Sequence, residues 1–172
     1  MRSARFAIIS LAVLFLLVTG IGMLFSSRVT VVRQVDIQAS KDAVFQYVSD
    51  IHLWDRWMVD STQAIAFFTR FSNKKGASAQ IGHSRVTITA LSNSLMETQW
   101  QGTRGNPQTS DFLLVPSRAV PNGWTVRWSF SQELNWYPWQ RIGASLQEKI
   151  LGPSMEKALD RLKTDLEKQT GN

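Results

Sequence analysis

The segment Leu146–Gln169 constrains the fold of this chain most, because it has the pattern of a helix with one apolar face. Its apolar positions recur four, three and four residues apart, at Met155, Leu159, Leu162 and Leu166. Such a helix is stable only when its apolar face is buried against another element of the chain. Gly152-Pro153 interrupts the pattern, and because proline lacks a backbone N–H we expect a kink or a fresh helix start there.

The residues ahead of this helix alternate between apolar and polar side chains, as half-buried strands do. The clearest alternation lies at Gly123–Gln132, and a similar one lies at 29–38. Further strands are predicted at 64–71, 77–81, 85–91, 95–101 and 110–115, with turn residues between them. Ser40 has the position of an N-cap, which predicts a helix after it, and a second short helix is predicted over His52–Met58. This order favours an α+β domain in which a curved antiparallel sheet wraps around the closing helix.

The first part of the chain contains a long apolar run. Phe6–Phe25 holds twenty residues without a charge, a length of about 30 Å as a helix, which matches the hydrocarbon core of a bilayer. A cleaved signal peptide is the main alternative and a buried helix the second, but the run ends without a good small-residue cleavage site. We therefore expect a transmembrane anchor over residues 1–27. Arg2 and Arg5 favour a cytoplasmic amino end, so residues 28–172 are expected on the periplasmic or extracytoplasmic side of a single-pass membrane protein.

Composition excludes several classes of function. The 172 residues include no Cys and only 2 His, which excludes disulfide scaffolds, zinc ribbons, iron–sulfur clusters and thiol nucleophiles, and argues against a His-rich metal site. We expect no metal and no cofactor. The net charge is +6, but the basic residues are scattered rather than gathered in a stripe, so nucleic acid is not an expected partner. A weak attraction to anionic lipid head groups is the alternative interpretation of that charge.

Two segments carry motifs in a specific order. In DIQASKDAVFQYVSDIHLWDRW, at Asp36–Trp57, a strand ends in a small-residue helix cap and a helix leads to a corner formed by Val48, Asp50, Trp54 and Trp57. The second segment, ILGPSMEKALDRLKTDLEK, covers Ile150–Lys168 and has a G-x-x-x-E-x-x-L-x-x-L-K pattern. Together they resemble the START-like, polyketide cyclase–dehydrase and lipid transport (SRPBCC) superfamily over about residues 29–168, as a membrane-anchored member.

The resemblance implies a helix-grip (START-like) fold. In that fold a curved antiparallel sheet of about seven strands grips a long C-terminal helix, here preceded by one N-terminal transmembrane helix. Members of the superfamily have different functions, since some carry lipids or sterols, some cyclise polyketides, some bind plant hormones and some bind proteins. The resemblance therefore implies a hydrophobic small molecule or lipid as the class of ligand, and it leaves the function itself open.

The candidate ligand-binding residues are aromatic side chains and one methionine that are placed to line a cavity between sheet and helix: Trp54, Trp57, Met58, Trp100, Trp128, Phe130, Trp136 and Trp139. The tryptophans at the helix corner either line the cavity mouth or plug the end of the sheet as core. The strand aromatics face the cavity or fill it. The two in the loop around Pro138 form a ligand lid, an aromatic belt at a bilayer surface, or loop packing.

Acid–base residues do not form a recognisable constellation. The candidates fall on different predicted elements, at Asp55, Asp60, Glu97, Glu133, His52 and His83, with Arg33, Arg85 and Arg127 as oxyanion or carboxylate partners. A cyclase or dehydratase needs a proton donor and an acceptor placed together in a partly dry pocket. The sequence also has no Gly-rich phosphate loop, nucleophile elbow or HExxH motif. Catalytic residues are therefore not assigned, and a non-enzymatic function is favoured.

Three functions remain open at this stage. The first is a membrane-tethered module that binds a lipid or other hydrophobic small molecule between the sheet and the C-terminal helix. The second is a non-enzymatic partner-binding or structural domain whose cavity is filled by Trp and Phe. The third is an enzyme that resembles polyketide cyclases and dehydratases. The sequence indicates no particular protein partner.

Overall fold

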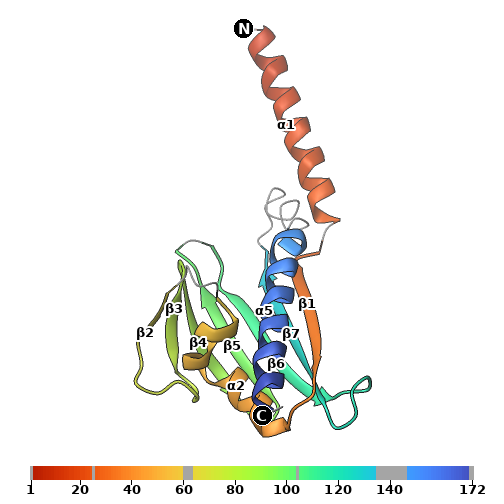
Figure 1. Cartoon of the computed structure of the whole chain (residues 1–172). Helices are drawn as coiled ribbons and strands as arrows, with labels where there is room; N and C mark the ends of the chain where they lie inside the picture. The colour runs from red at the N-terminus through yellow and green to blue at the C-terminus, as the bar shows by residue number, and fades with distance from the viewer. Residues whose placement is uncertain (1, 25, 60–63, 104, 135–146, 171–172) are drawn as a thin grey trace.

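A computed structural model describes residues 2–24, 26–59, 64–103, 105–134 and 147–170 of the chain (Figure 1). The helices are α1 (Arg2–Met23), α2 (Lys41–Ser49), the 3-10 turn η1 (Ile51–Leu53), α3 (Trp54–Trp57) and α5 (Gln147–Thr170). The strands are β1 (Arg28–Ile37), β2 (Ile65–Phe67), β3 (Ser78–Ile81), β4 (Ser84–Leu91), β5 (Leu95–Gln101), β6 (Gln108–Pro116) and β7 (Trp124–Glu133).

The seven strands form one antiparallel sheet in the order β1-β7-β6-β5-β4-β3-β2. Strands that follow one another in sequence from β2 to β7 are neighbours, and β1 closes the order by pairing with β7. The sheet curves, and α5 lies against its inner face, with α2 beside the lower end of the sheet (Figure 1). The structure therefore confirms the predicted α+β helix-grip fold with a seven-stranded sheet and a long C-terminal helix.

Helix α5 buries the apolar stripe that the sequence predicts. The four stripe residues are at most 2% exposed: Met155, Leu159, Leu162 and Leu166. Of the two alternatives predicted at Gly152-Pro153, the fresh helix start does not form, because α5 continues through Pro153 as a single helix. A proline inside a helix removes one backbone hydrogen bond, and the burial of the stripe that follows offsets that loss.

Gly152 allows β1 to approach α5 closely. A Cβ atom at this position would lie 2.3 Å from Nη2 of Arg33, so a larger residue here would force the Arg33 guanidinium to move. The Arg33 guanidinium instead crosses the helix there, and its Nε donates to Oε1 of Glu156 at 2.6 Å. Gly152 and Glu156, one helical turn apart, thus seat the Arg33 side chain of β1 on α5.

Two caps direct the chain from β1 into the corner of the fold. Ser40 is the N-cap of α2, as predicted, and its Oγ accepts a hydrogen bond from the backbone N–H of Ala43 at 3.3 Å. Asp50 ends α2, and its carboxylate accepts from the backbone N–H of His52 at 2.9 Å, which starts η1. The turn that Asp50 creates points the following helix α3 at the inner face of the sheet. The short helix predicted over His52–Met58 is thus present as η1 and α3.

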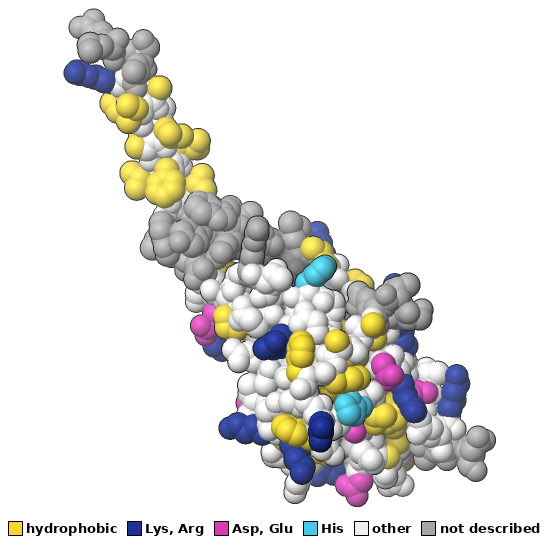
Figure 2. Space-filling view, turned by 90° about the vertical axis from the view of Figure 1, so that its left-hand side faces the viewer, with side chains coloured by type: hydrophobic (Ala, Val, Ile, Leu, Met, Phe, Trp, Pro, Cys, Tyr) yellow, Lys and Arg dark blue, Asp and Glu magenta, His cyan; other side chains and the backbone are white. Residues whose placement is uncertain are grey.

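Helix α1 projects away from the sheet (Figure 1). Its large apolar side chains between Phe6 and Ile21 are exposed (Figure 2). Within the described chain no helix has the length and apolar character needed to cross a membrane. The predicted transmembrane anchor and the single-pass localisation that followed from it are therefore wrong.

Candidate functional site

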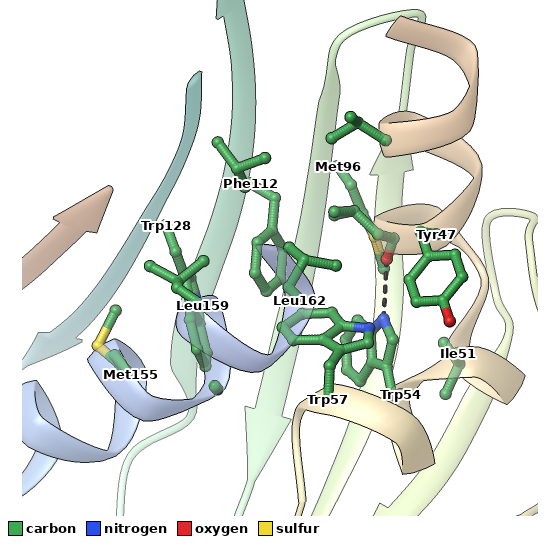
Figure 3. Close-up of a cluster of buried hydrophobic side chains, with 14 of the residues drawn as sticks. Tyr47, Ile51, Trp54, Trp57, Met96, Phe112, Trp128, Met155, Leu159 and Leu162 are labelled. Atoms are coloured by element: carbon green, nitrogen blue, oxygen red, sulfur yellow. Dashed lines mark hydrogen bonds between the residues drawn. The ribbon is translucent and has the colours of Figure 1, made fainter. Parts of the chain in front are cut away.

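The corner formed by η1 and α3 inserts two tryptophans into the core. Trp54 and Trp57 lie three residues apart on α3, so both point to the same side of the helix, and both are 0% exposed. The indole Nε1–H of Trp54 donates to the backbone oxygen of Val48, near the end of α2, at 2.8 Å (Figure 3). This hydrogen bond ties the two short helices together and holds the Trp54 ring against the sheet.

The inner face of the sheet supplies four more rings. These six side chains, called the aromatic cluster below, are Trp54, Trp57, Trp100, Phe112, Trp128 and Phe130. Trp54 stacks on Trp100 with ring centroids 6.2 Å apart, and Trp57 meets Phe112 edge to face at 5.9 Å. These spacings and tilts are the ones that aromatic pairs prefer. Pairwise ring contacts therefore join all six side chains into one cluster, and Figure 3 shows four of them, Trp54, Trp57, Phe112 and Trp128, beside α5.

Hydrogen bonds on the inner face fix two of the strand indoles. Trp128 Nε1 donates to the buried Oγ of Ser110 at 2.7 Å, and Trp100 Nε1 donates to Oγ1 of Thr98 at 3.0 Å. The Thr98 hydroxyl in turn donates to the backbone oxygen of Ser110 at 3.1 Å. Each of these polar groups is satisfied by a neighbour on the same or the adjacent strand, so the rings keep a fixed orientation.

Trp57 differs from the other cluster tryptophans in one respect. Its Nε1–H is buried and has no hydrogen-bond partner among the described residues. Leaving such a donor unpaired costs about 1–3 kcal/mol, so native cores rarely do it. A buried, unused donor between the sheet and α5 is where the polar atom of a bound molecule would be stabilised most.

Methionines surround the rings. Met96 on β5 and Met155 on α5 are both 0% exposed, and Met58, the residue after α3, packs against the same core (Figure 3). Unbranched thioether side chains change rotamer more easily than branched ones and adapt to occupants of different shape. The inner core thus combines fixed rings with adjustable side chains.

The structure brings most of the predicted ligand-binding residues together. Five of them belong to the aromatic cluster and the sixth, Met58, packs against it. Trp136 and Trp139 lie outside the described residues. Sequence reasoning missed Phe112 and its neighbour Ser110, although Phe112 stands at an inward position of the strand predicted at 110–115. Counting every second residue along that strand as inward-facing would have identified both Ser110 and Phe112.

The acid–base candidates lie apart from one another. Those that the structure describes are distributed over exposed positions or are already paired. His52 meets the ring of Phe67 edge-on at 4.3 Å, Arg85 lies over the ring of Phe68, and Glu133 pairs with Arg28 at 2.8 Å. The remaining candidates are Asp55, Glu97, His83 and Arg127, all exposed, with Arg33 bonded to Glu156 and Asp60 outside the described residues. Among the described residues, the buried polar side chains are Ser49, Thr98, Ser110 and Thr125.

A polar clamp holds α5 over the corner. The Tyr47 hydroxyl donates to the Asp165 carboxylate, and it accepts from Gln169 at 3.1 Å and from Arg56 at 3.3 Å. Burial and the hydrogen bond to Asp165 raise the pKa of Tyr47 above its ordinary value. The hydroxyl therefore stays protonated, and the clamp joins α2, α3 and the end of α5 at neutral pH.

Comparison with known proteins agrees with this architecture. Residues 28–167 match the family described as "Polyketide cyclase / dehydrase and lipid transport". No curated protein sequence matches the chain. A START superfamily protein from Mycobacterium smegmatis has a TM-score of 0.62 at 16% identity, over 81% of this chain and 98% of that one.

Two further solved structures extend the comparison. A protein from Nitrosospira multiformis has a TM-score of 0.63 at 12% identity, over 84% of this chain and 100% of that one. The di-domain ARO/CYC StfQ from the steffimycin biosynthetic pathway has a TM-score of 0.61 at 11% identity, over 84% of this chain and 52% of that one. At such identities the likeness establishes a shared fold, and the function of each protein depends on its own side chains.

Proposed function

Because this chain belongs to the polyketide cyclase/dehydrase and lipid transport family, we propose that it binds a hydrophobic small molecule, such as a lipid, between the sheet and α5. The observation that carries the proposal is the unpaired Nε1–H of Trp57, buried in the aromatic cluster. A ligand with one hydrogen-bond acceptor on an apolar body would satisfy that donor. The surrounding rings would contribute apolar contact, worth about 25 cal/mol per Å² of surface removed from water.

Room for the ligand comes from the adjustable part of the core. Met58, Met96 and Met155 stand beside the rings and can take other rotamers without breaking a hydrogen bond. Trp128 and Trp100 are held by hydroxyl groups and stay in place. The proposed ligand therefore displaces thioether side chains rather than rings, and its acceptor atom lies within hydrogen-bond reach of Trp57.

The experiment compares two ligands that differ only in the acceptor, 2-octanone and octane, added to the full-length protein. Two-dimensional NMR of the indole N–H groups measures the effect at each tryptophan. We expect 2-octanone to shift the Trp57 Nε1–H signal downfield and octane to leave it in place, because only the ketone oxygen accepts a hydrogen bond. The Trp57→Phe variant assigns that signal and should bind the two ligands equally.

Trp124→Phe is the matched control, because Trp124 lies at the other end of the inner face, where Lys41 covers its ring at 5.6 Å. That variant should keep the preference for the ketone. Native mass spectrometry gives an independent readout of apolar molecules that copurify with the protein. Protein that carries no such molecule and shows no response to either probe would contradict the proposal.

A second candidate function rests on a different observation. Trp54, Trp57 and Phe112 are all 0% exposed, so the described part of the inner face is filled by its own rings. A filled core suits a non-enzymatic domain that binds a partner through its surface. The same NMR experiment separates the two, because a filled core leaves all cluster indole signals unmoved by either ligand.

A further inference from the structure

The outer face of the sheet carries a pocket of about 760 Å³ that is independent of the aromatic core. This outer-face pocket lies where the β6–β7 loop, residues 117–123, meets β1, β6 and β7, and it is lined by Gln34, Asp36, Val115, Pro116, Ser117, Arg118, Ala119, Thr125 and Arg127. Its strand residues alternate with buried ones such as Ile37 and Val126, so they point away from α5. The volume falls within the range of small-molecule sites, about 300–1,000 Å³.

The wall of this pocket is built by the loop that follows β6. The Ser117 hydroxyl donates to the Asp36 carboxylate at 2.8 Å and accepts from the backbone N–H groups of Ala119 and Val120, both at 3.1 Å. Thr125 on β7 donates to the same carboxylate. The loop is therefore bonded to the sheet at Asp36, and the residue after Ser117 is held over the outer face.

Gly123 closes the loop back onto the sheet. A Cβ atom there would lie 2.7 Å from the backbone oxygen of Ile37 and 2.8 Å from Cγ1 of Val120. Only glycine permits this approach, and it returns the chain to β7 directly beside the end of β1. The position of Arg118 above the strands is thus set by the backbone.

The positive groups in the pocket are free to bind a ligand. Among the described residues, neither Arg118 nor Arg127 has an ion-pair or hydrogen-bond partner. The Asp36 carboxylate also lines the pocket and keeps its negative charge at neutral pH, with both hydroxyl donors on its Oδ1, and the Asp111 carboxylate accepts from Ser129 at 2.5 Å. Gln34 lies opposite Arg127 in the β1–β7 register and adds an amide donor on the same face. Two guanidiniums and an amide therefore surround the pocket.

We propose that the outer-face pocket binds a small organic oxyanion, a carboxylate or a phosphate ester, between Arg118 and Arg127. A guanidinium presents two parallel N–H donors that match the two oxygens of either group. Gln34 donates a further hydrogen bond. The apolar body of the ligand lies against Val115 and Pro116, which form the apolar side of the pocket.

The test titrates the full-length protein with three probes: inorganic phosphate, acetate and benzoate. Backbone NMR shifts at Gln34, Thr125 and Arg127 report binding at the pocket. We expect shifts at these residues with at least one oxyanion, and tighter binding of benzoate than of acetate because its ring contacts the apolar side. Binding of phosphate without acetate assigns a phosphate ester as the ligand class, and the reverse result assigns a carboxylate.

Two variants decide whether the arginines carry the binding. Arg127→Gln and Arg118→Gln should each weaken binding about tenfold, because each removes a charge-assisted hydrogen bond. Arg70→Gln, an exposed arginine outside the pocket, is the matched control and should bind as the unmodified protein does. Shifts that map elsewhere, or equal affinity in all three variants, would overturn the proposal. The result is independent of the aromatic core, because none of the probes requires a response at a tryptophan.

Discussion

The two faces of the sheet are built from alternate residues of the same strands, yet they are held together by different physics. On the inner face Trp128 and Phe112 stack at 5.0 Å, and their stabilisation comes from apolar surface removed from water. On the outer face Ser129 bonds to Asp111 at 2.5 Å and Thr30 to Ser131 at 2.9 Å. We therefore expect the free energy of unfolding to depend on side-chain volume at the inner face and on side-chain charge at the outer face.

Phe112→Ala tests the inner face most directly. Phe112 is 0% exposed and touches three tryptophans of the cluster, so its removal leaves a cavity that the fixed rings cannot fill. We expect a loss of about 3–5 kcal/mol in the free energy of unfolding, measured by urea denaturation. Leu113→Ala, the next residue on the outer face, should lose about 1 kcal/mol or less. Equal losses at the two positions would remove the distinction between the faces.

Asp36→Asn tests the outer face through pH. The hydrogen bonds from Thr125 and Ser117, with Lys163 as a smaller cause, hold the pKa of Asp36 below its ordinary value. A depressed carboxyl pKa stabilises the fold above the unfolded value, about 3.9, and that stabilisation is lost as pH falls through the folded pKa. We expect the variant to lose about 1–2 kcal/mol at pH 7. The difference in Tm between the two proteins should shrink below about pH 4, and a difference that is constant from pH 7 to pH 2 would contradict this account.

Trp57→Phe and Trp128→Phe sharpen the comparison within the inner face. Both replacements remove part of a buried ring, but among the hydrogen bonds of the described residues only that of Trp128 to Ser110 is lost. We expect Trp128→Phe to cost about 1 kcal/mol more than Trp57→Phe in thermal or urea unfolding without ligand. The same cost in both variants would mean that Trp57 has a partner in the free protein.

Arg28→Gln should change the free energy of unfolding least among these variants. Arg28 and Glu133 form an ion pair at 2.8 Å, but their side chains are 64% and 74% exposed. We expect a change of about 0.5 kcal/mol or less, and a smaller one in high salt, because water and ions screen the pair. A larger loss of unfolding free energy that does not depend on salt would show that this exposed ion pair is as poorly screened as a buried one.

The sequence predicted the elements that follow a strict period. The stripe on α5, the alternation along β7 and the cap at Ser40 all gave the right structure, because one face of each element is buried. The fresh helix start predicted as one alternative at Pro153 was wrong, because the packing of the helix offsets the one backbone hydrogen bond that proline removes. The prediction for the apolar run in α1 was also wrong: the length of Phe6–Phe25 and its lack of charge indicated a membrane span that the structure does not support.

The candidate site was predictable in part. The tryptophans of the corner and of β7 could be placed on the inner face by counting positions. That Nε1–H of Trp57 lacks a partner among the described residues could not be predicted, because this depends on where neighbouring carbonyls and hydroxyls lie in space. The outer-face pocket could not be predicted from the sequence either, because Asp36, Ser117 and Thr125 come together only when β1 pairs with β7.

That pairing of β1 with β7 also has a consequence for the order of folding. Arg28 stands opposite Glu133 and Ile37 opposite Trp124, so the first strand is synthesised long before its partner exists. Contacts this far apart in sequence slow folding, because a large loop must close before they form. While the ribosome adds the intervening strands, Val31 and Ile37 lack the core that later covers them. The chain therefore becomes a folded domain only after β7 has emerged.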